Sequence, residues 1–235
     1  MIFIGMNIET IIKKVLMEEF INTNDFIYED IYGSVEDVNL LQEAEYQGRK
    51  VQLGKIMQGD IKKFKVYVKN DKGKVVKVNF ESYNLGLGSS DQKQYLNISL
   101  ETSSSTINSI NNKSNYYQKK IKFLGPANRD FFHKKEEITI TTLDKVMLDK
   151  NCATIDLIKI DTEGYEYEVL KGSVEVLKKT KLILFEHHYD NMIIKNYTFK
   201  QINNFLIQNS FKKVFKAKMP FRKTFDYIYE NTRKF

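Results

Sequence analysis

The feature that most constrains the fold is a nearly continuous apolar run that ends abruptly in acids and a glycine. The run TIDLIKIDTEG covers residues 154–164, and YEYEVLKGSVEVLKKT follows it with apolar side chains at helical spacing. A strand that is apolar on both sides is typical of a parallel sheet whose two faces are covered. The stretch therefore predicts a buried strand, a turn that carries Asp161 and Glu163, and a helix.

Strand-like and helix-like segments alternate along much of the chain, which favours an open α/β sheet. Strand patterns are expected at 1–5, 25–32, 138–141 and 181–188, helix patterns at 8–20, 34–45, 143–149 and 198–211, and a closing antiparallel strand pair at 212–231. At 235 residues with 42% hydrophobic residues, the chain is long enough for one domain with a sizeable core. We therefore expect a single domain over residues 1–235.

Two segments depart from this alternation. In residues 51–100, polar and apolar residues alternate as in β-strands. The stretch NDKG at 70–73 lies between two such alternating segments and is expected to form the turn of a hairpin. Residues 99–120 are polar and poor in apolar side chains. A polar stretch of this length predicts a flexible loop, and such loops often close over a binding site.

Composition limits the classes of protein and of partner. The net charge is +7, but the lysines are scattered among acids and asparagines, which favours a solvated surface over a nucleic-acid stripe. No run of about 18 apolar residues appears, so we expect no membrane span. The single cysteine, Cys152, excludes an internal disulfide framework and indicates a reducing, cytoplasmic compartment.

In open α/β sheets, ligands bind outside the carboxyl ends of the strands. That rule places several short segments along one edge: 5–7, 29–30, 85–88, 161–164 and 186–188. A carboxylate at Asp161 can accept a proton from a hydroxyl, hold a divalent cation or orient a substrate. Glu163 can do the same, and it also suits the first turn of a helix.

Those edge residues, in this order, resemble the FkbM family of S-adenosylmethionine-dependent methyltransferases. The strongest similarity is TLDKVMLDKNCATIDLIKIDTEGYEYEVLKGSVEVL at 142–177, with its Asp-Leu-x-Lys-Ile-Asp-x-Glu-Gly element. The segments LILFEHH (182–188), NLGLGSS (84–90) and FDYIYEN (225–231) are similar to further family elements. The resemblance covers most of residues 79–230.

The resemblance implies a fold and a cofactor. The fold is a Rossmann-like class I methyltransferase fold, with a mostly parallel sheet, a C-terminal antiparallel strand and the β-rich segment near 51–100. The cofactor is S-adenosyl-L-methionine, bound by Gly5, Asn7, Glu29, Leu87 and Asp161. The first turn departs from the family pattern, because FIGMNIE at 3–9 has Phe3 in place of the usual Asp and Glu9 in place of the last Gly.

The resemblance also implies an activity, O-methylation of a hydroxyl on a sugar, a glycan or a glycosylated small molecule. Asp161, His188 and Glu163 are then the catalytic residues, with His188 as the base by the family's Glu-x-His spacing. Asp161 and Glu186 are the candidate ligands of a divalent metal, whose involvement stays open. The oligomeric state is not indicated by the sequence.

Two other functions stay open at this stage. A nucleic-acid 2′-O-methyltransferase is favoured by the net charge and by a set of Lys159, Asp161, Lys181 and Glu186. The third hypothesis is a methyltransferase-like interaction module without catalysis, which the altered first turn motivates.

Overall fold

The structure is a computed structural model, and it describes residues 2–3, 43–55, 57–60, 64–69, 72–80, 83–99, 104–124, 131–219 and 223–235. The helix expected at 8–20, the strand at 25–32 and residues 34–42 of the helix expected at 34–45 lie outside these residues, as do Gly5, Asn7 and Glu29. Residues 43–45, expected at the end of that helix, instead belong to a β-strand, so this end of the expected helix is wrong. The chain divides into two compact units, one of Met1–Ile8 with Leu85–Phe235 and the other of Glu9–Asn84. The single-domain organisation stays a prediction.

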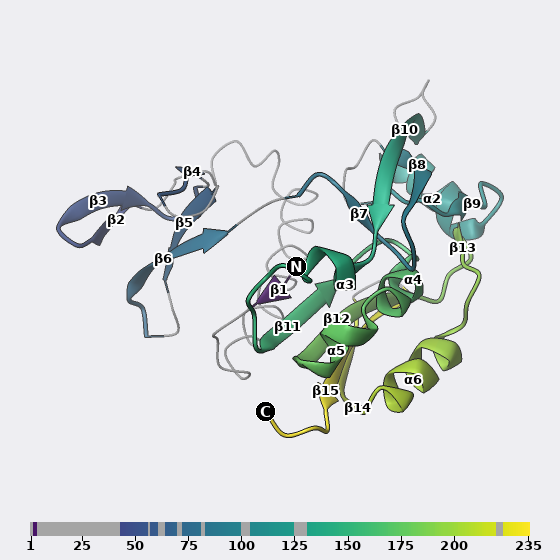
Figure 1. Cartoon of the computed structure of the whole chain (residues 1–235). Helices are drawn as coiled ribbons and strands as arrows, with labels where there is room; N and C mark the ends of the chain where they lie inside the picture. The colour runs from purple at the N-terminus through teal and green to yellow at the C-terminus, as the bar shows by residue number, and fades with distance from the viewer. Residues whose placement is uncertain are drawn as a thin grey trace. The chain divides into compact units, whose positions relative to one another are not determined.

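A five-stranded sheet forms the centre of the larger unit (Figure 1). Its order is β1 (Ile2–Phe3), β11 (Ile155–Ile160), β12 (Thr180–His188), β15 (Thr224–Asn231) and β14 (Phe211–Lys218). Strands β11 and β12 run parallel, with Ile160 beside Phe185. Strand β1 runs antiparallel to β11, β15 antiparallel to β12, and β14 antiparallel to β15.

The expectation of a mostly parallel, Rossmann-like sheet is therefore wrong. Among the described strands of the central sheet, β11 and β12 form one parallel pair beside three antiparallel pairs. The smaller sheets of the chain are mixed or antiparallel. The physical reason is that an apolar run reports burial on both faces of a strand and carries no information on the direction of its neighbours.

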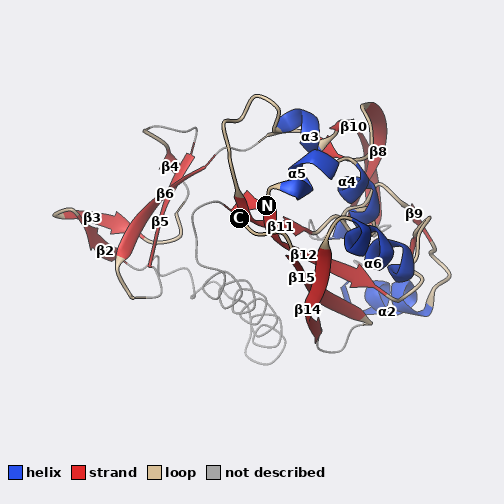
Figure 2. Cartoon of the chain, turned by 60° about the horizontal axis from the view of Figure 1, so that its bottom comes forward, coloured by secondary structure: helices blue, strands red, loops and turns tan. Residues whose placement is uncertain are grey.

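The main core lies between the central sheet and four short helices. These are α3 (Leu143–Val146), α4 (Glu166–Lys171), α5 (Val174–Lys178) and α6 (Phe199–Gln208), which Figure 2 shows in blue beside the red strands. Thr198 starts α6 with a capping box to Gln201. Fully buried side chains from helices and strands meet in one cluster, including Leu170, Leu177, Ile183, Phe185, Ile202, Leu206 and Tyr229. Each such side chain contributes about 1.5–3 kcal/mol through its removal from water.

A second layer of the larger unit comes from residues 85–141 with one later strand. Strands β7 (Gly86–Leu87), β10 (Phe132–Thr141) and β8 (Gln92–Ser99) form a mixed sheet, and β9 (Ser109–Ile110) pairs with β13 (Ile193–Ile194). Helix α2 (Asn115–Leu124) follows β9. The stretch expected as a flexible loop at 99–120 contains, over its described part, strand β9 and the first residues of α2, with irregular residues before and between them. Tyr117 of α2 packs on buried Phe131, an apolar contact that the polar sequence of this stretch did not indicate.

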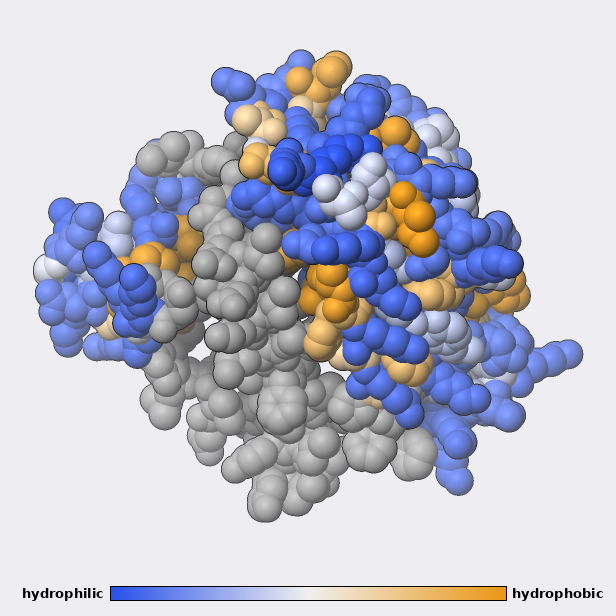
Figure 3. Space-filling model, turned by 90° about the horizontal axis from the view of Figure 1, so that it is seen from below, coloured by the Kyte–Doolittle hydropathy of each residue, from blue (hydrophilic) through white to orange (hydrophobic). Residues whose placement is uncertain are grey.

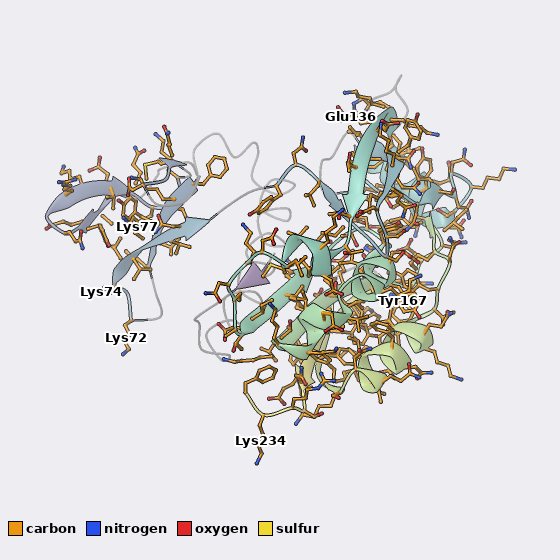
Figure 4. The ribbon with its side chains drawn as sticks, in the orientation of Figure 1. Lys72, Lys74, Lys77, Glu136, Tyr167 and Lys234 are labelled. Atoms are coloured by element: carbon orange, nitrogen blue, oxygen red, sulfur yellow. The ribbon has the colours of Figure 1, made fainter. Side chains whose placement is uncertain are left out.

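The smaller unit is built from antiparallel strands. A hairpin of β2 (Glu43–Tyr46) and β3 (Arg49–Gln52) accompanies a sheet of β4 (Met57–Gln58), β5 (Phe64–Lys69) and β6 (Val75–Phe80). Strands β5 and β6 pair from Lys69 opposite Val75, which confirms the hairpin predicted around NDKG. Figure 4 shows Lys72 and Lys74 at the turn of this hairpin. The unit carries a hollow of about 650 Å³, lined by Tyr46, Arg49, Lys50, Asp60 and Tyr67 among others.

The surface of the described residues is largely polar. Figure 3 shows one face, on which hydrophilic residues dominate outside the grey atoms. Within the described part of the chain, no helix has the length and apolar character to cross a membrane.

The helix predicted after residue 164 is divided into α4 and α5, and a close backbone contact lies at the break. Gly172 follows α4, and a Cβ placed on it would lie 1.9 Å from the carbonyl oxygen of Gly88. Gly88 is itself fixed, since its N–H donates to the carbonyl of Thr141 at 2.9 Å. Only glycine allows this approach.

We predict that Gly172→Ala lowers the free energy of unfolding by about 2–3 kcal/mol, because the backbone must move to admit the methyl group. The matched control is Gly86→Ala, whose Cβ would lie 3.2–3.3 Å from side-chain atoms of Ile140 and Ile138 and at an ordinary 3.6 Å from the carbonyl oxygen of Thr139. Chemical denaturation measures both. Equal losses in the two variants would contradict the close contact.

Candidate functional site

The candidate site lies where the parallel strands β11 and β12 end. Asp161 directly follows β11, and Glu186 and His188 are the last polar residues of β12. The register that pairs Ile160 with Phe185 brings Asp161 and Glu186 to the same edge of the sheet. Because side chains alternate along a strand, Glu186 and His188 share one face and His187 points to the other. This agrees with the predicted placement of both segments at one edge.

The turn after β11 has an unusual backbone conformation. Glu163 has a φ of 48° and Gly164 a φ of 92°, so two consecutive residues are left-handed. For a residue other than glycine this conformation costs about 1–2 kcal/mol. A Cβ on Gly164 would also lie 2.8 Å from Asn108 Nδ2. In this conformation, Glu163 Oε2 lies 3.2 Å from His188 Nε2.

A buried carboxylate holds the turn in place. Glu166 is 1% exposed, and its Oε1 accepts hydrogen bonds from the N–H of Gly164 at 2.8 Å and from the N–H and Oγ1 of Thr162. Its Oε2 accepts a hydrogen bond from the hydroxyl of Tyr197. Both oxygens of Glu166 are therefore hydrogen-bonded, and the bonds to Thr162 and Gly164 offset the strain at Glu163.

Two residues from a distant part of the sequence complete the support. Thr106 Oγ1 donates to the carbonyl of Glu163 at 2.7 Å, and Asn108 Nδ2 donates to the carbonyl of Gly164 at 2.6 Å. Both belong to the stretch in which the sequence predicted a flexible loop, and neither was a candidate. Their sequence context offers no local signal, because the contacts span 57 and 56 residues.

Three side chains meet at the centre of the site, and we call Glu163, Glu186 and His188 the acid–histidine cluster. His188 Nε2 lies 2.8 Å from Glu186 Oε1 and 3.2 Å from Glu163 Oε2. The side chains of His188, Glu186 and Glu163 are 7%, 11% and 13% exposed. On the other side of the ring, Nδ1 lies 3.1 Å from Thr224 Oγ1 and 3.6 Å from Asp190 Oδ2.

The contact between Nε2 and Glu186 Oε1 is an ion-pair contact at 2.8 Å. Among the described residues, Nε2 has no hydrogen-bond partner although it is buried. The contact is therefore electrostatic. Burial alone would lower the pKa of His188, but the contacts with Asp190 and Glu186 and the charge of Glu163 raise it to about 10.

The pKa values of two carboxyl groups of the site, Glu163 and Asp161, are raised. Burial raises the pKa of Glu163 to about 7; His188 opposes the shift, and the charges of Glu186 and Asp161 add to it. Partial removal from water, followed by the charge of Glu186, raises the pKa of Asp161 to about 6. Asp161 is exposed at the rim of the site, so water moderates this second shift. The electrostatics thus favour positive charge between these groups.

The neighbouring His187 has a different environment. Its ring packs among Tyr189, Tyr197 and Phe199 on the helix side of the sheet, with ring centroids 4.8–5.9 Å away. Burial first, and then the charges of Lys195 and His188, lower its pKa to about 4. His187 is therefore a neutral core residue, and the two adjacent histidines differ because they face opposite sides of β12.

The structure does not assemble the remaining candidates into one group. Leu87 lies in β7, partly buried against the main core cluster. Lys181 lies at the start of β12 and pairs with Asp156 at 2.7 Å. Five residues of strand, about 16 Å, separate Lys181 from Glu186. The set of Lys159, Asp161, Lys181 and Glu186 is therefore not brought together.

We predict that Glu166→Gln lowers the free energy of unfolding by about 2–3 kcal/mol, because the amide can replace only one of the two acceptor oxygens. Hydrogen exchange at the Gly164 amide is expected to accelerate. The control is Tyr197→Phe, which removes one donor at Oε2 and leaves the Gly164 bond intact. A Gly164 amide equally protected in Glu166→Gln and in the unchanged protein contradicts the role of Glu166.

Comparison with known protein families gives one match. The model of the methyltransferase FkbM domain matches residues 55–215, which is more than half of the chain and includes the turn and the acid–histidine cluster. Searches of curated proteins and of solved structures gave no match. The match includes residues 142–177, where the resemblance noted from the sequence is strongest. The chain therefore belongs to the FkbM methyltransferase family.

Proposed function

We propose that this methyltransferase is an S-adenosylmethionine-dependent O-methyltransferase that acts on a hydroxyl of a sugar, a glycan or a glycosylated small molecule. The observation that carries the proposal is the position of exposed Asp161 beside the acid–histidine cluster, at the common end of β11 and β12. Carboxylate and imidazole groups are the side chains that bind and deprotonate hydroxyls. Family membership supports methyl transfer.

S-adenosyl-L-methionine supplies an electrophilic methyl group on a sulfonium. The residues proposed to hold it are Gly5, Asn7, Glu29, Leu87 and Asp161, of which the structure describes the last two. Both fit this cofactor, since an exposed carboxylate complements its cationic groups and a half-buried leucine offers an apolar surface to adenine.

The residues of the site take distinct roles in this proposal. Asp161 is exposed and accepts the proton of the acceptor hydroxyl. Loss of the proton to Asp161 would make the acceptor oxygen a nucleophile toward the methyl group that the bound cofactor would supply, with the carbon–sulfur electron pair left on sulfur. His188 lies enclosed by Glu163, Glu186 and Asp190, so we assign it and Glu163 to positioning the hydroxyl.

The two rival functions draw less support from the site. Lys181 forms an ion pair with Asp156 and lies far from Asp161, which weakens the nucleic-acid 2′-O-methyltransferase reading. A non-catalytic module does not require a strained Glu163 beside a buried histidine. A cytoplasmic location, indicated by the single Cys152, belongs to the proposal as well.

We predict that the purified protein binds S-adenosylmethionine in a calorimetric titration, and that Asp161→Asn lowers methyl transfer to hydroxyl acceptors by about 10²–10⁴-fold because the base is lost. Transfer is measured as release of S-adenosylhomocysteine with a panel of glycosides. The matched control is Asp149→Asn, an exposed residue after α3, which keeps full activity.

Two outcomes contradict the proposal. The absence of binding near millimolar S-adenosylmethionine removes the enzymatic function. Full activity of Asp161→Asn with an intact fold, checked by thermal unfolding, removes Asp161 as the base.

A further inference from the structure

The acid–histidine cluster has the dimensions of a metal site. One ligand atom each from Glu163, Glu186 and His188 lies within 4.8 Å of the other two. Two neighbouring ligands of an octahedral ion at about 2.1 Å lie about 3 Å apart. The two contacts of Nε2, at 2.8 and 3.2 Å, match that separation.

The histidine provides a second observation that points to a ligand. His188 is 7% exposed, and its Nε2 lies between two carboxylates without a hydrogen-bond partner in the described part of the chain. Its Nδ1 faces Thr224 Oγ1 and Asp190 Oδ2. Histidines that bind metals are oriented in this way, by a polar group on the nitrogen that does not ligate.

The surrounding charges also favour a cation. The largely buried carboxyl groups of Glu163 and Glu186 flank one imidazole, and burying like charges together is costly unless a positive charge lies among them. The nearby Lys195, which acts electrostatically on Glu163, donates from Nζ to the backbone carbonyl of His188 at 2.5 Å. A divalent cation between the carboxylates of Glu163 and Glu186 would offset the repulsion between these two groups.

We propose that Glu163, Glu186 and His188 bind a divalent transition-metal cation, with Asp161 beside it at the rim. An imidazole combined with carboxylates favours Mn²⁺, Fe²⁺ or Zn²⁺ over Mg²⁺ and Ca²⁺, which prefer oxygen ligands alone. Three protein ligands leave coordination positions open for an oxygen of a ligand.

This proposal gives the cluster a role in catalysis that rests on the proposed function. A cation at this position orients the acceptor hydroxyl and makes it more acidic, while Asp161 takes the proton. The strained backbone of Glu163 then serves to place its carboxylate among the ligands. Metal binding itself does not depend on the identity of the acceptor.

The test is titration of the full chain, after treatment with a chelator, with Mn²⁺ followed by electron paramagnetic resonance of the free ion. One site with a Kd of about 1–100 µM is expected. Glu186→Gln should weaken binding by about tenfold or more. The matched control is Glu175→Gln, an exposed residue paired with Lys178, which should bind as the unchanged protein does.

Thermal unfolding shows whether each variant is folded, and Glu163→Gln replaces Glu186→Gln if the latter is not. A stoichiometry well below one, or equal affinity in the cluster variants and the control, overturns the proposal. Titration of the same metal-free protein with S-adenosylhomocysteine separates the two claims. If the protein binds S-adenosylhomocysteine but not Mn²⁺, the metal site alone is rejected. If it binds Mn²⁺ but not S-adenosylhomocysteine, the proposed function alone is rejected.

Discussion

The site depends on the hydrogen bonds that the buried carboxylate of Glu166 accepts. This side chain fixes the N–H groups of Thr162 and Gly164, and Thr106 and Asn108 fix the carbonyls on the same turn. Without these bonds, a left-handed Glu163 would relax to a less strained conformation. The strain therefore persists because the hydrogen bonds of Glu166, Thr106 and Asn108 together over-determine the turn.

The consequence of the turn is a concentration of acidic groups around one imidazole. Parallel pairing of β11 with β12 brings Asp161 beside Glu186, and the turn after β11 brings Glu163 to His188. Antiparallel β15 supplies Thr224 to the far side of the His188 ring. The chemistry of the site thus comes from strand register and one turn, and the surrounding sheet need not be mostly parallel to create it.

The sequence predicted the elements that carry the site better than it predicted their arrangement. Strands β11 and β12 were recognisable because both are long apolar runs, and Gly164 marked the turn. The direction of the neighbouring strands could not be predicted, because a buried strand has the same apolar sequence pattern whether its neighbours run parallel or antiparallel to it. Glu166 read as an ordinary position in the first turn of a helix, and its support of residues 162–164 emerged only from the geometry of the fold.

The central claim is that the turn after β11 and the end of β12 form one acceptor site beside the cofactor. A crystal structure with S-adenosylhomocysteine and Mn²⁺, with an anomalous difference map to locate the metal, tests this claim directly. The account predicts the cofactor sulfur next to Asp161 and an anomalous peak between Glu163, Glu186 and His188. A bound cofactor whose sulfur lies away from Asp161, with no peak at the cluster, would contradict it.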